Sequence, residues 1–145
     1  MIIGAGASGI MASITAKDNG KDVGILESQK RIGQKLLSTG NGRCNITNRN
    51  INYSRYHSKN PDFFKDTLDN FTLNDTIKFF NSLGLPLTTL ENGKMYPLSL
   101  QASSVLDILK MALEDRDIPI YLNSEVKDVI PTKKYFKIFF SRNNI

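Results

Sequence analysis

The pattern of apolar and polar residues predicts a strand, a helix and a second strand before Glu27. The apolar "MII" before Gly4 is typical of the end of a short buried strand. A helix is predicted from Ser8 to Asn19, ended by Gly20, with one apolar side formed by Ile10, Met11 and Ile14. "DVGIL" then predicts a second strand. A unit of this kind favours parallel pairing of its two strands.

The segment from 28 to 60 has no sustained hydrophobic period, and we expect a long polar loop there. Pro61 suits the first position of a helix that carries Phe64, Leu68 and Phe71 on one face. A second helix is predicted after it, with Thr72 and Asp75 as a capping pair, an apolar side of Leu73, Ile77 and Phe80, and Gly84 at its end.

The last third of the chain predicts a hairpin, a helix and three strands. Asn92-Gly93 stands between two short extended runs, which favours a hairpin with a type I′ turn. Residues 101–115 have a helical apolar pattern formed by Val105, Leu106, Leu109, Ala112 and Leu113. "IPIYL" predicts a strand, and the segments of about 125–132 and 135–141 predict two strands of a meander.

Composition and charge then narrow the class of protein. The chain has 145 residues, 40% hydrophobic and 23% charged, which is ordinary for one soluble domain. Its net charge of +5 is uneven, because no acid lies between Glu27 and Asp62 while seven cations do: Lys30, Arg31, Lys35, Arg43, Arg49, Arg55 and Lys59. This basic interval suits phosphate in a nucleotide or a nucleic acid, although a solvated loop has the same composition.

Other sequence features argue against several sites and locations. The single cysteine cannot form an internal disulfide, no C-x-x-C is present, and no apolar run reaches transmembrane length. We therefore expect a cytoplasmic protein with no metal site and no membrane partner.

The sequence "GAGASG" carries the first chemical signal. Gly4, Gly6 and Gly9 have the G-x-G-x-x-G spacing between a predicted strand and helix. In such a turn the first glycine permits the bend, the second lets a pyrophosphate approach, and the third allows close helix packing. The phosphates would lie at the start of the helix near Ala7 and Ser8. About 20 residues further on, Glu27 suits a ribose hydroxyl and disfavours a ribose 2′-phosphate.

The glycine spacing alone does not distinguish FAD from NAD. The layout beyond Glu27 favours FAD, because a long insertion precedes "IPIYL" and two meander strands follow it. This is the layout of FAD domains of the glutathione-reductase type.

Further segments have a more specific pattern: "GQKLLSTGNGRCNITN", "NGKMYPLSLQASSVLDIL" and "IPIYLNSEVKDV". With "GAGASG" and Glu27, they resemble the BaiN-like NAD(P)/FAD-dependent oxidoreductases, a family that includes aminoacetone-oxidase-like proteins. The resemblance covers essentially the whole chain, and its most specific part is the G-x-G-R-C-N-x-T-N pattern.

The resemblance implies an α/β fold: a Rossmann-like FAD/NAD(P)-binding domain of glutathione-reductase type, with a parallel sheet, helices and a β-meander. Residues 1–145 would form an incomplete FAD domain with a helical and hairpin insertion at about 60–98. A substrate domain and the returning segment that completes the FAD site would be absent. An exposed apolar surface is then expected, with possible self-association.

The resemblance also implies a set of cofactor contacts. The pyrophosphate would meet Gly4, Gly6, Ala7, Ser8 and Gly9, and the ribose would meet Glu27 and Ser28. The backbone of Val126 would contact adenine. The residues along the cofactor toward the flavin would be Lys35, Thr39, Gly42, Arg43, Cys44 and Asn45.

Several single residues have simpler interpretations. Cys44 lacks the second thiol that a flavin disulfide reductase needs, so we expect packing or a backbone contact. Arg43 suits a phosphate or the flavin, or a bracing role in the loop. Asn41, Asn45 and Asn48 suit positive φ angles. His57 is expected at the surface. Core positions are expected for Tyr96, Phe63, Phe64, Phe79 and Phe80.

These patterns support three hypotheses about function. The first is the FAD-binding part of an oxidoreductase, with hydride transfer between NAD(P)H, FAD and an unidentified small substrate, or amine oxidation with O₂ in the reverse sense. The sequence assigns no catalytic residue. The second, less favoured, is a nucleic-acid-binding module in which Tyr53 and Tyr56 stack on bases. The third is a truncated remnant without activity of its own.

Overall fold

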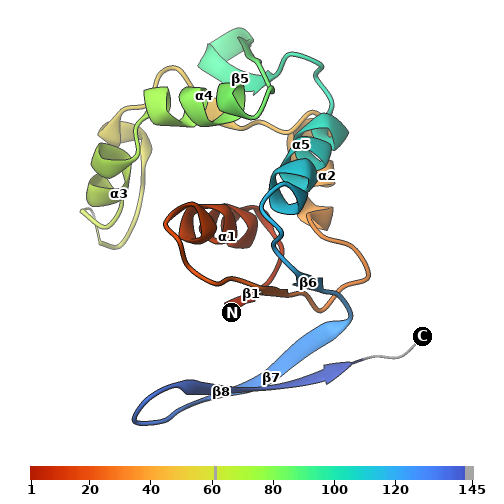
Figure 1. The fold of residues 1–145 in the computed structure, drawn as a ribbon. Helices are drawn as coiled ribbons and strands as arrows, with labels where there is room; N and C mark the ends of the chain where they lie inside the picture. Colours follow the sequence, from red (N-terminus) through yellow and green to blue (C-terminus); the bar gives the residue numbers. More distant parts are fainter. Residues whose placement is uncertain (61, 143–145) are drawn as a thin grey trace. The chain divides into compact units, whose positions relative to one another are not determined.

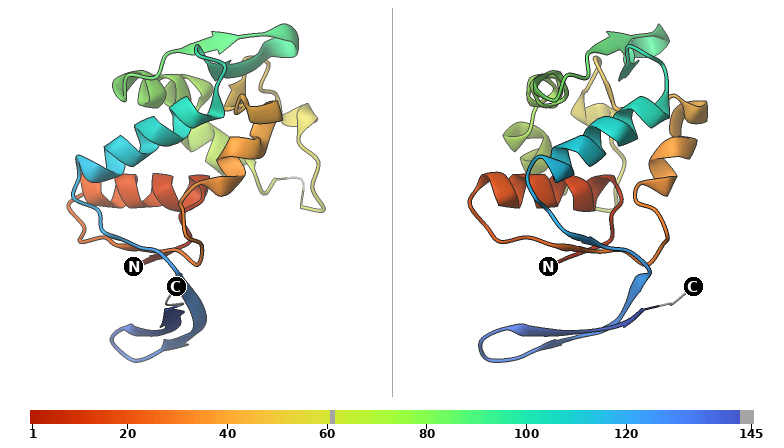
Figure 2. Two further views of the ribbon diagram at one scale, coloured as in Figure 1. Left: turned by 90° about the vertical axis from the view of Figure 1, so that its right-hand side faces the viewer. Right: turned by 45° about the vertical axis from the view of Figure 1, so that its right-hand side comes forward.

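The computed structural model of the chain describes residues 1–60 and 62–142, so the prediction for Pro61 lies outside the described residues. The chain divides into two compact units. The first unit contains Met1–Leu36 and the chain from Leu109 onward, and the second is Leu37–Ile108. Figures 1 and 2 show the elements of both.

A parallel sheet forms the centre of the first unit. Its strands are β1 (Ile2–Ile3), β2 (Ile25–Leu26) and β6 (Ile120–Tyr121), in the order β1-β2-β6. All pairs are parallel, with Ile25 between Ile2 and Ile120. Helix α1 (Ala7–Asp18) connects β1 to β2 and lies along the sheet (Figures 1 and 2). The predicted strand, helix, strand unit and its parallel pairing are confirmed, although the second strand is shorter than predicted.

Buried apolar residues hold this unit together. Ile10 and Ile14 of α1 and Ile25 of β2 are buried completely or almost completely. The apolar face predicted for residues 101–115 is that of helix α5 (Ala102–Glu114), which spans the boundary between the units. It is buried at Leu109, Ala112 and Leu113 in the first unit and at Val105 and Leu106 in the second. Gly20 ends α1 at φ +71, and its N–H donates to Lys17 O at 2.9 Å, as the sequence predicts.

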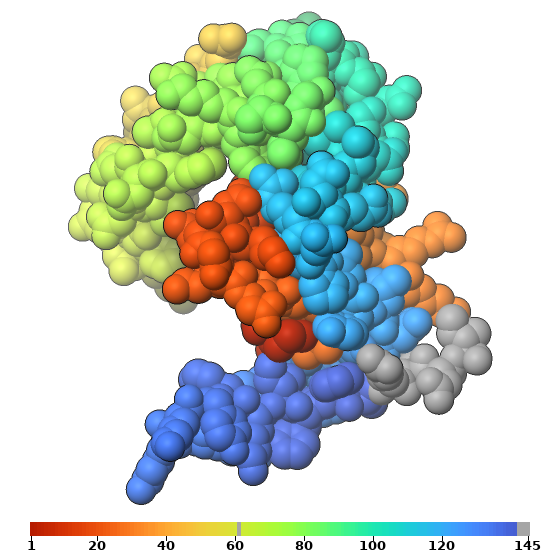
Figure 3. Space-filling model, in the orientation of Figure 1, coloured from red at the N-terminus to blue at the C-terminus, as the bar shows by residue number. Residues whose placement is uncertain are grey.

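A two-stranded antiparallel hairpin follows β6. It consists of β7 (Ser124–Pro131) and β8 (Phe136–Arg142), with a bulge between Val126 and Asp128. The two strands match the predicted pair. Figure 3 shows the hairpin in blue at the surface. Its exposed apolar side chains are Val129, Ile130, Tyr135, Phe136, Phe139 and Phe140.

The second unit contains a small antiparallel sheet and two helices. The sheet has the order β3-β5-β4, and helix α2 (Gln34–Ser38) spans the boundary between the units. The other elements are η1 (Thr39–Gly42), β3 (Thr47–Asn48), η2 (Tyr53–Arg55), α3 (Lys65–Asn70), α4 (Leu73–Ser82), β4 (Leu87–Thr89), η3 (Glu91–Gly93) and β5 (Lys94–Pro97).

The prediction of a long loop at 28–60 is therefore wrong in part. Helix α2 has only five residues, too few for a visible period. Strand β3 exists because Thr47 and Asn48 pair with Met95 and Lys94, which the local sequence cannot reveal.

Local signals in this unit are confirmed. The Thr72 hydroxyl accepts from Asp75 N, and the Asp75 carboxylate accepts from Thr72 N, which forms a complete capping box for α4. Asn92 and Gly93 have φ angles of +59 and +74. Lys94 N donates to Glu91 O, as in a turn of the predicted kind.

Two predictions about side chains need correction. Of the four phenylalanines predicted for the core, Phe63 is 76% exposed and the other three, Phe64, Phe79 and Phe80, are only half-buried, because α3 and α4 contain no buried residue. Of the three predicted asparagines only Asn41 has a positive φ, since Asn48 lies in β3. Tyr96 is buried as predicted and His57 is exposed.

Two further findings concern the requirements of a membrane-spanning helix and of a metal site. Among the helices of residues 1–60 and 62–142, none is long and apolar enough to cross a membrane. Within the same residues, no three His, Cys, Asp or Glu side chains lie together in a way that could hold a metal ion.

Candidate functional site

The turn between β1 and α1 is shaped by its three glycines. Gly4 has a φ of +92, and its N–H donates to Leu26 O at 2.8 Å. A side-chain carbon at Gly9 would lie 1.9 Å from Gly4 O, so only glycine lets the helix approach the turn. At Gly4 and Gly6 such a carbon would meet nothing within 4 Å. The third glycine is thus required by packing, whereas the first two border open space.

The N-terminus of α1 is available to an anion. Gly6 is the N-cap, with extended backbone at φ −79 and ψ −177, and it offers no side-chain cap. The first turn contains no acid. The first N–H groups of a helix have no partner within it, and they carry the positive end of the helix dipole. The turn therefore has the backbone chemistry that binds phosphate.

Glu27 ties this turn to the segment that follows β2. Its side chain is almost buried, with 8% of the residue exposed. One carboxylate oxygen accepts from Ala5 N at 2.6 Å, and the other accepts from Gln29 N at 2.8 Å and from the Ser28 hydroxyl at 3.2 Å. A carboxylate has about four acceptor sites, so these bonds leave room for about one further donor.

The glycine turn and Glu27 line one cavity in the first unit. Its volume is about 530 Å³, within the usual range for ligand pockets of about 300–1,000 Å³. The hydrogen bond from Gly33 N to Ala5 O, 2.9 Å long, joins two of its walls. The lining residues are Gly4, Ala5, Gly6, Glu27, Ser28, Gln29, Arg31, Gly33, Gln34 and Lys35.

This cavity contains part of the predicted site and adds to it. Gly4, Gly6, Glu27, Ser28 and Lys35 line it as neighbours. The other lining residues were not assigned to the site from the sequence. Among them only the exposed Arg31 could have been found, because it lies in the basic interval after Glu27. Val126 pairs with Phe140 in the hairpin and does not line the cavity. Its contact with adenine remains a prediction.

The predicted loop from Thr39 to Asn45 lies in the second unit, and several of its residues have positive φ angles. Gly40, Asn41 and Gly42 have φ angles of +55, +55 and +78, and Cys44 has +59. A side-chain carbon at Gly40 would lie 2.9 Å from Asn45 N. This close approach explains the glycine at position 40.

Internal hydrogen bonds stabilise the loop. Cys44 N donates to Thr39 O at 3.0 Å, and the Cys44 side chain is buried, as the packing interpretation predicts. With its amide nitrogen facing the strand, Asn45 donates to Thr47 O at 2.9 Å and to Met95 O at 3.2 Å. Asn45 thus braces the loop against β5.

Arg43 has a bracing contact and also borders a cavity. Its guanidinium lies over the Tyr96 ring, 5.3 Å from the ring centre, and its Nε donates to Gly40 O at 3.4 Å. With Lys94 and Glu91 it lines a cavity of about 370 Å³ in the second unit. The position of Arg43 is compatible with both predicted roles, which are a contact with the cofactor and a bracing contact within the loop.

A parallel sheet in the order β1-β2-β6, a glycine turn at the start of α1 and an acid at the end of β2 define a dinucleotide-binding Rossmann domain. The chain belongs to the family of the HI0933-like protein Rossmann domain, whose model matches residues 1–145. This assignment confirms the resemblance drawn from the motifs.

Two kinds of curated relative match the chain. It is 45% identical over 139 residues to a 3-dehydro-bile acid delta(4,6)-reductase of Clostridium scindens, a match over 94% of this chain and 34% of the relative. It is 33% identical over 138 residues to a ribosomal RNA dihydrouridine synthase of Escherichia coli, over 95% of this chain and 34% of the relative. The chain thus spans about a third of the length of these relatives.

Solved structures support the fold. The match to THI4 of Thermovibrio ammonificans has a TM-score of 0.60 at 11% identity, over 94% of this chain and 43% of that one. An open conformation of a flavocytochrome c3 fumarate reductase matches with a TM-score of 0.57 at 19% identity, over 91% of this chain and 28% of that one. At these identities the likeness concerns the fold alone.

Proposed function

We propose that this chain is the FAD-binding part of a flavin-dependent oxidoreductase. The observation that carries the proposal is the cavity in which the uncapped start of α1, the open backbone at Gly4 and Gly6, and the Glu27 carboxylate meet. An anionic pyrophosphate and a neighbouring ribose match these three groups. FAD is favoured over NAD because a unit of Leu37–Ile108 precedes the third parallel strand and a hairpin follows it.

The described residues suit FAD. The N–H groups of the α1 start at Ala7, Ser8 and Gly9 would hold the pyrophosphate, with Gly4 and Gly6 leaving room for it. Glu27 and Ser28 would meet the ribose. For the other predicted residues we retain the FAD contacts that the family resemblance implies. These residues are Lys35, Thr39, Gly42, Arg43, Cys44, Asn45 and Val126. The bound flavin would supply the hydride chemistry, with NAD(P)H as the proposed donor.

The names of the relatives suggest a substrate class. A dihydrouridine synthase is named for dihydrouridine, the form of uridine in which the ring C=C bond conjugated to a carbonyl group is reduced. A delta(4,6)-reductase of a 3-dehydro-bile acid is named for C=C bonds that are conjugated to a 3-keto group. We propose that the whole protein reduces a C=C bond conjugated to a carbonyl, and that the 145 residues supply part of its FAD domain. Substrate binding would then involve segments beyond this cavity.

FAD titration of the purified chain tests the proposal. The chain should bind FAD, detected as a change in flavin absorbance and fluorescence. Gly6→Val should weaken binding at least about tenfold, because its side chain would occupy open space at an ordinary φ of −79 without touching the protein. Ala12→Val, on an exposed position of the same helix, is the matched control. A native chain with no FAD affinity would refute the proposal for this chain.

A nucleic-acid-binding module is the second candidate function. Two observations favour it. The interval between Glu27 and Asp62 is basic and contains no acid. The names of relatives in two species include ribosomal RNA. The stacking role foreseen for Tyr56 is restricted, because its ring already stacks on Phe64 with centres 4.8 Å apart. Salt-sensitive RNA binding without FAD binding would support this candidate. A chain that binds neither would be an inactive remnant.

A further inference from the structure

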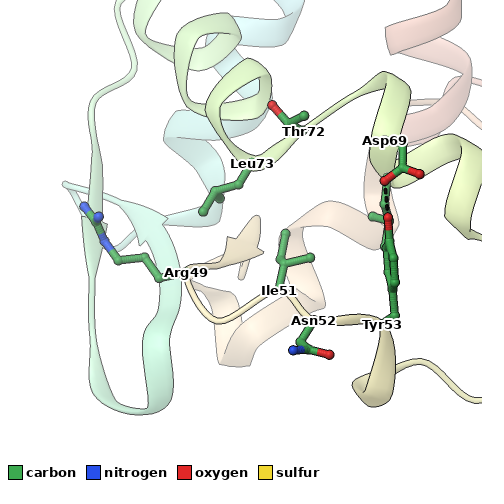
Figure 4. Close-up of a pocket in the computed structure, with 8 residues that line it drawn as sticks. Arg49, Ile51, Asn52, Tyr53, Asp69, Thr72 and Leu73 are labelled. Atoms are coloured by element: carbon green, nitrogen blue, oxygen red, sulfur yellow. Dashed lines mark hydrogen bonds between the residues drawn. The ribbon is translucent and has the colours of Figure 1, made fainter.

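A second polar cavity lies in the second unit, apart from the loop of Thr39–Asn45. It has a volume of about 400 Å³, and we name it the Tyr53 pocket. Its walls come from the segment after β3, from η2, from the end of α3 and from the start of α4 (Figure 4). The lining residues are Arg49, Ile51, Asn52, Tyr53, Leu68, Asp69, Thr72 and Leu73.

One end of the pocket presents an aromatic ring and a carboxylate. The Tyr53 hydroxyl donates to one oxygen of Asp69 (Figure 4), and Phe64 contacts the ring with centres 6.0 Å apart. Tyr53 as a whole residue remains 42% exposed, and the Lys65 ammonium lies over its ring, 5.8 Å from the ring centre. Within the described part of the chain, the second Asp69 oxygen has no hydrogen-bond partner and Asp69 forms no ion pair. This end therefore offers a stacking surface beside a charged acceptor.

Arg49 lines the opposite side of the pocket, and its guanidinium is directed away from Tyr53 (Figure 4). Arg49 lies across from the Tyr53–Asp69 pair, with Ile51 and Leu73 between them (Figure 4). The Arg49 Nε donates to the Thr89 hydroxyl at 2.8 Å, which restrains the guanidinium. Among residues 1–60 and 62–142 its two terminal amino groups have no hydrogen-bond partner. They remain available to an anion or a carbonyl oxygen.

We propose that the Tyr53 pocket binds one nucleotide of single-stranded RNA, with the base beside Tyr53 and a phosphate toward Arg49. The proposal extends the proposed function by giving the reductase an RNA substrate, a choice that rests on the ribosomal RNA named for two relatives. Bases stack on exposed tyrosines, and a base N–H or a ribose 2′-hydroxyl can donate to the open oxygen of Asp69. On one side of the pocket, the segment from Leu37 to Asn60 has only cations among its charges: Arg43, Arg49, Arg55 and Lys59. On the other side, α3 carries Lys65 and Asp66 besides Asp69.

A steroid fits the pocket less well, although one relative is named for a bile acid. A bile acid has a fused, largely saturated ring system, so it lacks the flat π-face that stacks on the Tyr53 ring. A nucleotide supplies a planar base for the ring, a donor for Asp69 and an acceptor for Arg49. Stacking therefore favours the nucleotide.

Fluorescence anisotropy with the full chain and labelled oligouridine tests the pocket. Tyr53→Leu should weaken binding by about tenfold or more, because the stacking surface is lost. Arg49→Gln should weaken binding and lower the slope of log affinity against log salt by about one. The matched controls are Tyr135→Leu, an exposed tyrosine of the hairpin, and Arg55→Gln, a cation of the same segment that does not line the pocket. Both controls should bind nearly as well as the parent.

Two outcomes would overturn the pocket proposal. One is an equal loss of RNA binding in the pocket variants and the controls. The other is binding of cholate that depends on Tyr53 and Arg49 while RNA binding does not. Tyr53→Phe retains the ring, so it should keep most of the RNA affinity. If Tyr53→Leu failed to fold, Arg49→Gln would carry the test of lost binding.

FAD titration of the same proteins separates the two proposals. The Tyr53 and Arg49 variants should retain the FAD affinity of the parent, since neither residue lines the cavity of the first unit. If the parent binds RNA through the pocket but no FAD, the proposed function fails alone. If it binds FAD while RNA binding ignores Tyr53 and Arg49, the pocket fails alone.

Discussion

Asp18, at the end of α1, and Arg116, just beyond α5, form a two-point ion pair in the first unit. The Arg116 Nε and one terminal nitrogen donate to the two Asp18 oxygens at 2.7 and 3.1 Å. Arg116 also donates to Ala112 O at 3.0 Å. The pair joins residues that are 98 positions apart, and it ties together segments on which the candidate FAD cavity depends.

The ion pair predicts a dependence of stability on pH. The hydrogen bond from Arg116 lowers the pKa of Asp18 below its usual value. The pair therefore stabilises the fold above the unfolded-state pKa of about 4, and the contribution is lost as pH falls through the lower folded-state pKa. Asp18→Asn should lower the free energy of unfolding at pH 7 by less than about 1 kcal/mol, because the Asp18 side chain is half exposed.

Urea denaturation at neutral and acidic pH measures this effect. The difference between the parent and Asp18→Asn should shrink below about pH 4. Asp22→Asn, a change of an exposed acid in the same unit, is the control. An unchanged difference across the acidic range would contradict the assignment.

Gly9→Ala should destabilise the first unit strongly. The new carbon would lie 1.9 Å from Gly4 O, so α1 must move away from the turn. A cost of about 1–3 kcal/mol is expected from overpacking. Gly6→Ala is the matched control, because its carbon meets nothing within 4 Å. Equal unfolding midpoints for the two variants would show that the turn does not have the described geometry.

Glu27→Gln should weaken both the fold and FAD binding. The carboxylate accepts from two backbone N–H groups, at Ala5 and Gln29, and an amide can accept through only one atom. Leaving one buried donor unpaired costs about 1–3 kcal/mol. Urea denaturation and FAD titration measure the two effects. Ser28→Ala keeps both backbone bonds and should have a smaller effect in urea denaturation. A stable Glu27→Gln variant with normal FAD affinity would remove Glu27 from the site.

The Cys44 thiol should react slowly in the folded protein. Only 4% of the residue is exposed, so a thiol reagent such as DTNB should modify it at a rate limited by opening of the fold. In urea the reaction should be fast. Cys44→Ala should leave FAD affinity unchanged, because neither packing nor a backbone contact with the cofactor needs the thiol. A rapid reaction in the native protein would instead indicate an accessible thiol.

We propose self-association through the β7–β8 hairpin. Its exposed apolar side chains include Phe136 and Phe139, at 68% and 50% exposure, and each strand of a two-stranded sheet has one open edge. Sedimentation velocity should show a mass that increases with concentration. Phe139→Lys should reduce the association, whereas Phe63→Lys, an exposed apolar position in the second unit, should not.

The sequence by itself determined the features that depend on local chemistry. The glycine spacing of Gly4, Gly6 and Gly9 indicated the turn, because each glycine meets a backbone requirement within a few residues. The capping box of Thr72 and Asp75 and the turn at Asn92-Gly93 are confirmed for the same reason. The apolar face of α5 followed from its period, and the family followed from motifs along the whole chain.

Only the tertiary structure decided the features that depend on residues far apart in the chain. Glu27 bonds to Ala5 N, which brings the glycine turn and the second strand together across the sheet. β3 exists through pairing with β5, and the Tyr53 pocket exists through Asp69, 16 residues further on. Hydrophobic period and turn chemistry describe neighbours along the chain. Pairing, burial and cavities arise from contacts that folding makes between distant segments.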